Sequence, residues 1–158
     1  MRPPRTYTTG PITRGLRALT VLAVLGTSAW ILVRYPELSG VVATHFDASG
    51  RPDSFGPRWS ILVLGGLMLV LSLGIVALSS RPRLFNYPVR ITEENAQAVY
   101  REGERMLVWT GLAIQPIYLG IAWSVIVGGG APLIVLGAVA LLAACAMGIV
   151  RMVRAGRR

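Results

Sequence analysis

The chain has 158 residues, of which 53% are hydrophobic and 15% are charged, and its formal net charge is +9. A soluble domain of this size cannot bury that much apolar surface, so the composition excludes an ordinary soluble globular protein. One cysteine excludes a disulfide scaffold. A large catalytic domain is also excluded, because no polar segment exceeds about 27 residues.

Four apolar stretches of 16, 20, 22 and 20 residues account for this composition: 18–33, 59–78, 106–127 and 131–150. At 1.5 Å per helical residue, each of them crosses or nearly crosses a hydrocarbon layer of ~30 Å. The sequence therefore predicts an all-α integral membrane protein, built as a four-helix transmembrane bundle.

The distribution of charge predicts the orientation of this bundle. All 16 basic residues are arginine, and 13 of them fall on one side if the helices alternate, whereas the other side has Arg34, Arg51 and Arg58. This asymmetry predicts that both termini and the 79–105 segment are cytoplasmic in a bacterial cell membrane. It also favours contact with anionic lipid headgroups. Nucleic-acid binding is not expected, because the basic residues are not gathered on a folded domain.

Residues 1–15 contain three prolines and two glycines without apolar periodicity, which predicts a disordered cytoplasmic tail. The predicted transmembrane domain covers 16–151, and the basic tail 152–158 follows it. Its helices are expected at about 16–34, 59–79, 93–127 and 131–151, with a loop at 35–58. The first helix is expected to be retained rather than cleaved as a signal peptide, since its apolar run continues beyond the small residues at 27–29.

The third helix is predicted to begin after Thr92, which has the side chain of an N-cap. Its first turns are amphipathic: apolar or small residues fall at 96, 99, 100, 103 and 107, and polar residues, including Glu104, are expected elsewhere around the helix. Gln115 and Pro116 are candidate polar and kink residues within the membrane. Gln115 is interpreted mainly as an interhelical hydrogen-bonding residue.

The short connection at 128–131 predicts that the third and fourth helices are antiparallel neighbours. In the fourth helix, Ala140, Ala144 and Gly148 recur at intervals of four residues. This stripe of small side chains predicts close packing against another helix.

The 34–58 segment between the first two helices contains most of the candidate functional residues of the chain. It contains the only histidine of the chain, His45, together with Phe46, Asp47, Gly50 and Asp53. Aspartate and glycine at 47–50 favour a turn, and the Pro52-Asp53-Ser54 run suggests a second turn. We therefore expect an ordered extracytoplasmic cap, which aromatic residues hold at the membrane boundary.

Several roles are open for His45, Asp47 and Asp53. An imidazole and two carboxylates could bind a divalent metal, His45 could act as a pH switch or a general base, or the loop could recognise a ligand. The reading favoured here is structural: the aspartates cap the loop backbone and His45 forms a local hydrogen bond. We expect no catalytic, cofactor-binding or metal-binding residue.

The loop also resembles a known family. The resemblance lies in the runs Tyr35-Pro36-Glu37-Leu38, Thr44-His45-Phe46-Asp47-Ala48-Ser49-Gly50 and Pro52-Asp53, and in Trp59. These runs are similar to the loop signature of a bacterial multi-pass membrane family with a domain of unknown function. That domain also occurs in the immunity protein against the sporulation-delaying toxin. The similarity covers about 18–78, and the 85–107 segment also looks like its relatives. The resemblance implies a membrane protein of toxin immunity or signalling.

The sequence thus predicts a non-enzymatic protein of the membrane that recognises an extracytoplasmic peptide or protein, or acts in toxin immunity. The alternatives are a small transporter or channel lined by Gln115, and a metal-dependent envelope enzyme that uses His45. The lipid bilayer is the one partner that every alternative shares. The oligomeric state is open.

Overall fold

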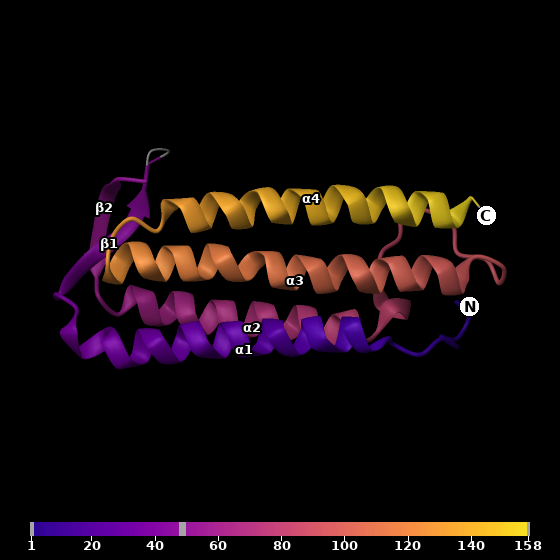
Figure 1. The fold of residues 1–158 in the computed structure, drawn as a ribbon, viewed down its shortest axis with the longest axis horizontal. Helices are drawn as coiled ribbons and strands as arrows, with labels where there is room; N and C mark the ends of the chain where they lie inside the picture. The colour runs from indigo at the N-terminus through magenta and orange to yellow at the C-terminus, as the bar shows by residue number, and fades with distance from the viewer. Residues whose placement is uncertain (1, 48–49, 158) are drawn as a thin grey trace.

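The computed structural model describes residues 2–47 and 50–157 and confirms the four-helix architecture (Figure 1). The helices are α1 (Pro11–Arg34), α2 (Ser60–Ser79), α3 (Ala96–Ile126) and α4 (Ala131–Gly156). Each is long and apolar enough to cross a membrane. The chain is therefore a multi-pass membrane protein.

Helix α3 is the centre of the bundle, because it packs against each of the other three helices. The best-buried apolar cluster joins α1, α2 and α3, and consists of Val24, Ile31, Ile61, Met68, Tyr118 and Ala122. Helix α4 packs mainly on α3 and leaves much of its apolar surface exposed. In a membrane protein this exposed surface faces lipid.

Close approach between α3 and α4 depends on glycines at their contact. An added Cβ at Gly148 would lie 2.3 Å from Met106 Cγ, and one at Gly137 would lie 2.8 Å from the backbone nitrogen of Ile117. The predicted antiparallel pairing of α3 and α4 is confirmed. Gly148 fulfils the predicted role of a close-packing residue.

The ordered loop is confirmed as a β-hairpin of β1 (Val41–Phe46) and β2 (Pro52–Pro57). The strands are antiparallel, with register irregularities near His45. The suggested turn at 52–54 is wrong, because these residues pair with β1 as part of β2. Within the predicted turn at 47–50, residues 48–49 lie outside the described part of the chain.

The hairpin lies across the end of the bundle that is opposite the chain termini (Figure 1). A short 3-10 turn at Tyr35–Glu37 (η1) leads from α1 into it. Gly50 has a φ of +78°, and an added Cβ there would lie 2.6 Å from the Cβ of Ala131 at the start of α4. The hairpin is therefore seated on the bundle rather than projecting from it.

The predicted disordered tail at 1–15 is wrong for the residues that the structure describes. Helix α1 begins at Pro11, where a proline suits the first helical turn. Residues 2–9 form an extended segment along η2 (Pro82–Leu84) and the N-terminal end of α3, which we call the N-terminal strap. Tertiary hydrogen bonds, which a local composition argument cannot detect, order this segment.

The two remaining boundaries also differ from prediction. Helix α4 continues to Gly156, so the predicted basic tail at 152–158 is largely helical. Helix α3 begins at Ala96 rather than near residue 93. Thr92 nevertheless acts as a capping residue, because its Oγ1 accepts from the Asn95 backbone N–H at 3.3 Å while Asn95 Oδ1 accepts from the Thr92 N–H at 2.9 Å.

Candidate functional site

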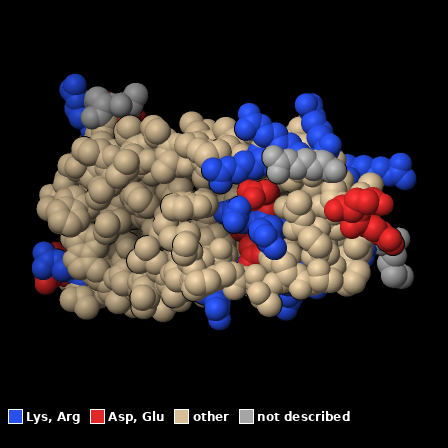
Figure 2. Space-filling view, turned by 45° about the vertical axis from the view of Figure 1, so that its right-hand side comes forward, with Lys and Arg blue, Asp and Glu red and all other residues tan. Residues whose placement is uncertain are grey.

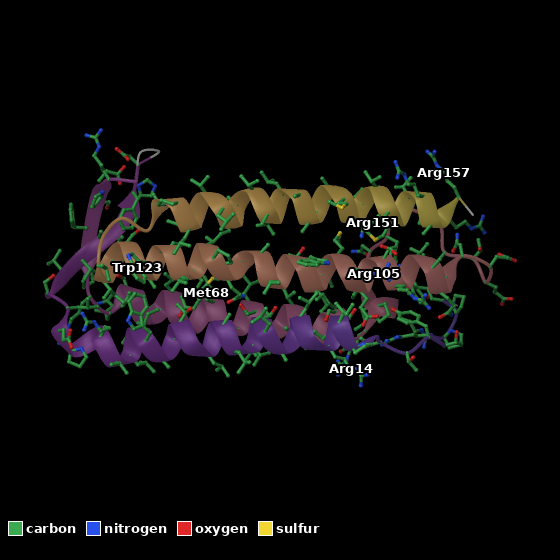
Figure 3. The ribbon with its side chains drawn as sticks, viewed as in Figure 1. Arg14, Met68, Arg105, Trp123, Arg151 and Arg157 are labelled. Atoms are coloured by element: carbon green, nitrogen blue, oxygen red, sulfur yellow. The ribbon has the colours of Figure 1, made fainter. Side chains whose placement is uncertain are left out.

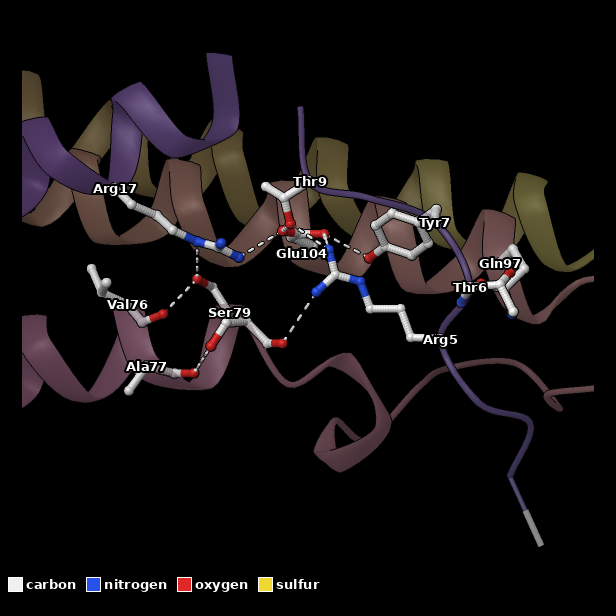
Figure 4. A network of polar contacts seen from close by, with 11 residues as sticks. Arg5, Thr6, Tyr7, Thr9, Arg17, Val76, Ala77, Ser79, Gln97 and Glu104 are labelled. Carbon is white, nitrogen blue, oxygen red and sulfur yellow. Dashed lines mark hydrogen bonds and ion pairs between the residues drawn. The ribbon is translucent and has the colours of Figure 1, made fainter. Parts of the chain in front are cut away.

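A buried carboxylate lies at the end of the bundle that carries the termini. Glu104 of α3 is 2% exposed, and its two carboxylate oxygens contact four polar side chains (Figure 4). Oε1 accepts from Arg17 Nη2 at 2.6 Å and from Thr9 Oγ1 at 2.7 Å. Oε2 accepts from the Tyr7 hydroxyl at 2.6 Å and lies 3.4 Å from Arg5 Nη2. A buried charge is stable only when it is paired in this way.

Three helices and the strap meet at this carboxylate. Arg17 comes from α1, and its Nε donates to Ser79 Oγ of α2 at 2.8 Å. Ser79 in turn donates to the Val76 carbonyl at 2.7 Å, so its hydroxyl is fixed as an acceptor for Arg17. We call the residues that meet here the Glu104 cluster: Arg5, Tyr7, Thr9, Arg17, Ser79 and Glu104.

The strap is held along its length as well as at Glu104. Gln97 binds it through both ends of its amide, because Nε2 donates to the Pro4 carbonyl at 2.7 Å and Oε1 accepts from the Thr6 N–H at 2.9 Å. The Tyr100 hydroxyl donates to the Pro3 carbonyl at 3.1 Å. Arg2 donates to the Phe85 carbonyl at 2.6 Å. The strap is therefore joined to both α3 and the segment that follows α2.

The surroundings of Tyr7 in the strap favour the protonated form of its phenol. Burial raises the pKa of Tyr7, and the hydrogen bond and negative charge of Glu104 raise it further. The Tyr7 ring also lies against two guanidinium groups, with Arg5 at 4.3 Å and Arg101 at 5.0 Å from its centroid. Tyr7 thus stays protonated as a donor to Glu104 over the ordinary pH range.

At the opposite end of the bundle, the structure brings His45 and Asp53 together across the hairpin. His45 Nδ1 lies 2.6 Å from Asp53 Oδ1, and their side chains are 69% and 45% exposed. Asp47 Oδ1 accepts from the Arg51 backbone N–H at 2.9 Å, and the Asp47 carbonyl accepts from the Gly50 N–H at 2.9 Å. Asp47 thus accepts from the loop backbone as expected, whereas the contact described for Asp53 is with the His45 side chain.

Other predicted loop residues have different surroundings. Phe46 is half-buried, whereas Phe55 of β2 is 63% exposed. Within residues 2–47 and 50–157, no group of three or more His, Cys, Asp or Glu side chains is close enough together to hold a metal ion. The two loop carboxylates therefore do not converge on His45 as a ligand set.

Within the membrane, Gln115 is 5% exposed and joins α3 to α2. Its Nε2 donates to Ser72 Oγ at 3.1 Å and to the Gly111 carbonyl at 2.8 Å, as an interhelical role predicts. Its Oε1 has no hydrogen-bond partner among the described residues. Helix α3 is continuous through Pro116, so this proline does not end the helix.

The comparisons with known proteins give the family context. A family described as "Domain of unknown function (DUF1648)" matches residues 21–69, which comprise most of α1, the hairpin and half of α2. All residues of the Glu104 cluster lie outside this stretch, with Arg17 just before it.

An uncharacterized protein of Archaeoglobus fulgidus is 26% identical to this chain over 114 residues. The aligned part covers 67% of this chain and 60% of that protein, so this chain spans less than two thirds of its relative. No solved structure matches the chain. The similarity therefore supports a multi-pass membrane protein with a domain of unknown function.

Sequence reasoning missed the Glu104 cluster because Glu104 was assigned to the polar side of the helix. The signal was present: Glu104 stands four residues from both Tyr100 and Val108, which are 0% and 4% exposed. A charged residue in register with a buried stripe must find a partner of opposite charge. Arg5 and Arg17 supply that charge, but their sequence separation from Glu104 conceals the contact.

Proposed function

We propose that this protein is a non-enzymatic membrane receptor that binds an extracytoplasmic peptide or protein at the hairpin and transmits the bound state to the N-terminal strap. The observation that carries the proposal is the course of α1. This helix joins the hairpin, through η1, to Arg17 and the strap at the opposite end of the bundle. One rigid element thus contacts both candidate sites.

The hairpin has the properties of a recognition surface. A two-stranded sheet has two unpaired edges, and an extended segment of another protein can pair with such an edge. Val41 and Phe55 are 60% and 63% exposed and offer apolar contact area beside these edges. The His45–Asp53 pair adds an exposed polar contact on the same hairpin.

Transmission is supported by the shared carboxylate at the other end. Arg17 of α1 and Arg5 of the strap both bind Glu104, so a shift of α1 changes the contacts that hold the strap. Bound and unbound states at the hairpin would then differ in how tightly the strap is held. The charge asymmetry predicts a cytoplasmic strap, and a strap released there is accessible to a partner.

A photo-cross-linking residue at position 55 tests recognition in the membrane of the source organism. We expect a discrete protein adduct, because Phe55 is exposed on the hairpin. The matched control is the same residue at position 139, where Val139 is 61% exposed on the lipid-facing side of α4. An adduct at both positions, or at neither, contradicts recognition by the hairpin.

The identified partner then allows transmission to be measured separately. Saturating the purified full-length protein with this partner should increase amide hydrogen exchange in residues 2–9. His45→Ala should weaken partner binding while changing the free energy of unfolding by no more than about 1 kcal/mol, since exposed polar pairs contribute little. Binding without a change in strap exchange would leave recognition intact and reject transmission.

Immunity to a membrane-active toxin is a specific form of this receptor role, and the resemblance in the loop supports it. In that form the hairpin binds the toxin itself. The partner captured at position 55 therefore distinguishes immunity from signalling, since a toxin indicates immunity and an envelope component indicates signalling.

A small transporter is the second candidate, and buried polar groups in the membrane favour it. Gln115 has an unpartnered oxygen among the described residues, and the hydroxyls of Ser28 and Tyr118 are 3.0 Å apart on neighbouring helices. Polar side chains inside a bundle can line a path for a solute. If transport occurs, Gln115→Leu should abolish flux in liposomes; flux that survives this change, or no flux in the unmodified protein, rejects this role.

A further inference from the structure

An apolar groove of about 610 Å³ lies between α3 and α4, and no residue of the Glu104 cluster or of the hairpin lines it. Its volume is within the range of small-molecule sites. Small and apolar side chains line most of its length, and charged side chains lie at one end only: Glu102, Arg105 and Arg151. The apolar length of the groove and its charged end match the acyl chain and the headgroup of a lipid.

The groove exists because side chains along its floor are short. Ala113 of α3 and all three members of the predicted small-residue stripe of α4 line it. The two alanines of the stripe leave space beside the close contact that Gly148 makes with Met106. Trp109 and Met147 line it as well, and they are 49% and 51% exposed. Open apolar surface on a membrane-spanning helix pair is in contact with acyl chains.

The length of the groove corresponds to one leaflet. Between Leu136 and Arg151 the axis of α4 rises by about 22 Å. Half of a bilayer of 40–45 Å, headgroups included, is also about 20–22 Å. On α3 the groove runs from Glu102 to Pro116, about two thirds of the way along the helix, and on α4 it reaches Leu136 in the second turn. The groove therefore extends from the arginine-rich end of the bundle past its midpoint, over a length close to the thickness of one leaflet.

The charged mouth suits a phosphate with a neighbouring hydroxyl. Arg105 and Arg151 lie at the same level on adjacent helices (Figure 3). Glu102 Oε1 pairs with Arg105 Nη1 at 2.7 Å, so the two guanidinium groups and one carboxylate leave a net positive charge. Glu102 Oε2 is buried and has no hydrogen-bond partner among the described residues. It can accept a hydrogen bond from a ligand hydroxyl.

The surrounding surface supports an anionic ligand. On the face in Figure 2, arginines gather toward the end that carries the chain termini, while an uncharged band covers the middle. The leaflet on the side with more arginine is expected to be the cytoplasmic one, which carries anionic lipids.

We propose that this groove is a specific site for one anionic glycerophospholipid of the phosphatidylglycerol type. An acyl chain lies along Ala140 and Ala144, the phosphate accepts hydrogen bonds from Arg105 and Arg151, and a headgroup hydroxyl donates to Glu102 Oε2. The bound lipid fills the gap between α3 and α4, so it stabilises the helix pair on which α4 depends. This site does not depend on recognition by the hairpin.

Native mass spectrometry of the full-length protein tests the proposal. The protein is equilibrated in mild detergent with equal amounts of phosphatidylglycerol and phosphatidylcholine that carry the same acyl chains. We expect one phosphatidylglycerol to be retained per chain. Arg151→Gln should weaken retention by about fivefold, and the double change with Arg105→Gln by about 30-fold, since each arginine near lipid phosphate contributes about 1 kcal/mol.

Two matched controls separate the groove from general surface effects. Arg157→Gln removes the same charge outside the groove and should leave retention unchanged. Ala140→Phe places a large ring in the groove and should abolish retention, whereas Val139→Phe on the neighbouring exposed position should not. If Ala140→Phe does not fold, the arginine series still decides the question.

Three outcomes would overturn the proposal. These are equal retention of both lipids, an equal loss on Arg157→Gln, and a lipid-free dimer in which a second copy covers α4. In the last case the groove is a protein interface rather than a lipid site.

Discussion

Replacing Glu104 with Gln is expected to lower the free energy of unfolding by about 3 kcal/mol, the lower end of the range for breaking a buried ion pair. The change keeps the size of the side chain but leaves Arg5 and Arg17 without their carboxylate, and these side chains are only 22% and 15% exposed. Unfolding of the purified protein, followed by helical circular dichroism during titration with a denaturing detergent, measures the loss.

The same change should release the strap, because Tyr7 and Thr9 also donate to Glu104. Hydrogen exchange of residues 2–9 should therefore increase while the middle of α3 stays protected. Glu93→Gln is the matched control, since Glu93 is exposed and its loss should change stability by no more than about 0.5 kcal/mol.

A double-mutant cycle assigns the energy to the pair. If the ion pair between Arg17 and Glu104 is the stabilising interaction, Arg17→Gln should lower the free energy of unfolding much less in the Glu104→Gln background than in the unmodified protein. Additive losses, or a strap that remains protected without the carboxylate, would show that packing rather than Glu104 holds this end of the bundle together.

Replacing Gly137 with Ala should destabilise the protein, whereas the same change at a helical glycine with open space around it should stabilise it. The added Cβ at Gly137 would lie 2.6 Å from Ile117 Cγ1, 2.8 Å from Ile117 N and 3.0 Å from the Ala113 carbonyl oxygen. Two of these atoms belong to the α3 backbone and cannot move alone. Separation of the helices should lower the free energy of unfolding by about 1–3 kcal/mol.

Gly66→Ala is the matched control for this change. Gly66 also lies within a helix, but an added Cβ there meets no atom within 4 Å. Alanine should stabilise this position by about 0.5–1 kcal/mol, because it restricts the unfolded chain and favours the helix. The same detergent titration measures both variants, and equal effects would mean that Gly137 does not set the distance between α3 and α4.

The hairpin shows how far local sequence could predict structure. Asp47 and Gly50 supply turn chemistry, and an ordered cap between the first two helices follows from it. Its strands were not predicted, and residues 52–54 were assigned to a turn. Pairing with Val41–Phe46 decided their conformation, and pairing across a turn depends on partners that a local propensity does not contain.

The candidate site shows the same limit more strongly. Gln115 was recognisable as a polar residue within an apolar run, and its predicted interhelical contact is made to Ser72. Glu104 was not recognised, because the charged residues around it look like the solvent-facing side of an amphipathic helix. The contact between Glu104 and Tyr7 joins residues 97 positions apart, so neither residue predicts the other.

The membrane class, the four spans and the arginine asymmetry can all be predicted from continuous stretches of the chain. These properties depend on the length and polarity of continuous segments, and transfer into hydrocarbon acts on each segment separately. The ordered N-terminal strap, the burial of Glu104 with two arginines and the groove between α3 and α4 became visible only in the folded chain. Those features depend on which helix faces pack together, and packing is a property of the whole assembled chain.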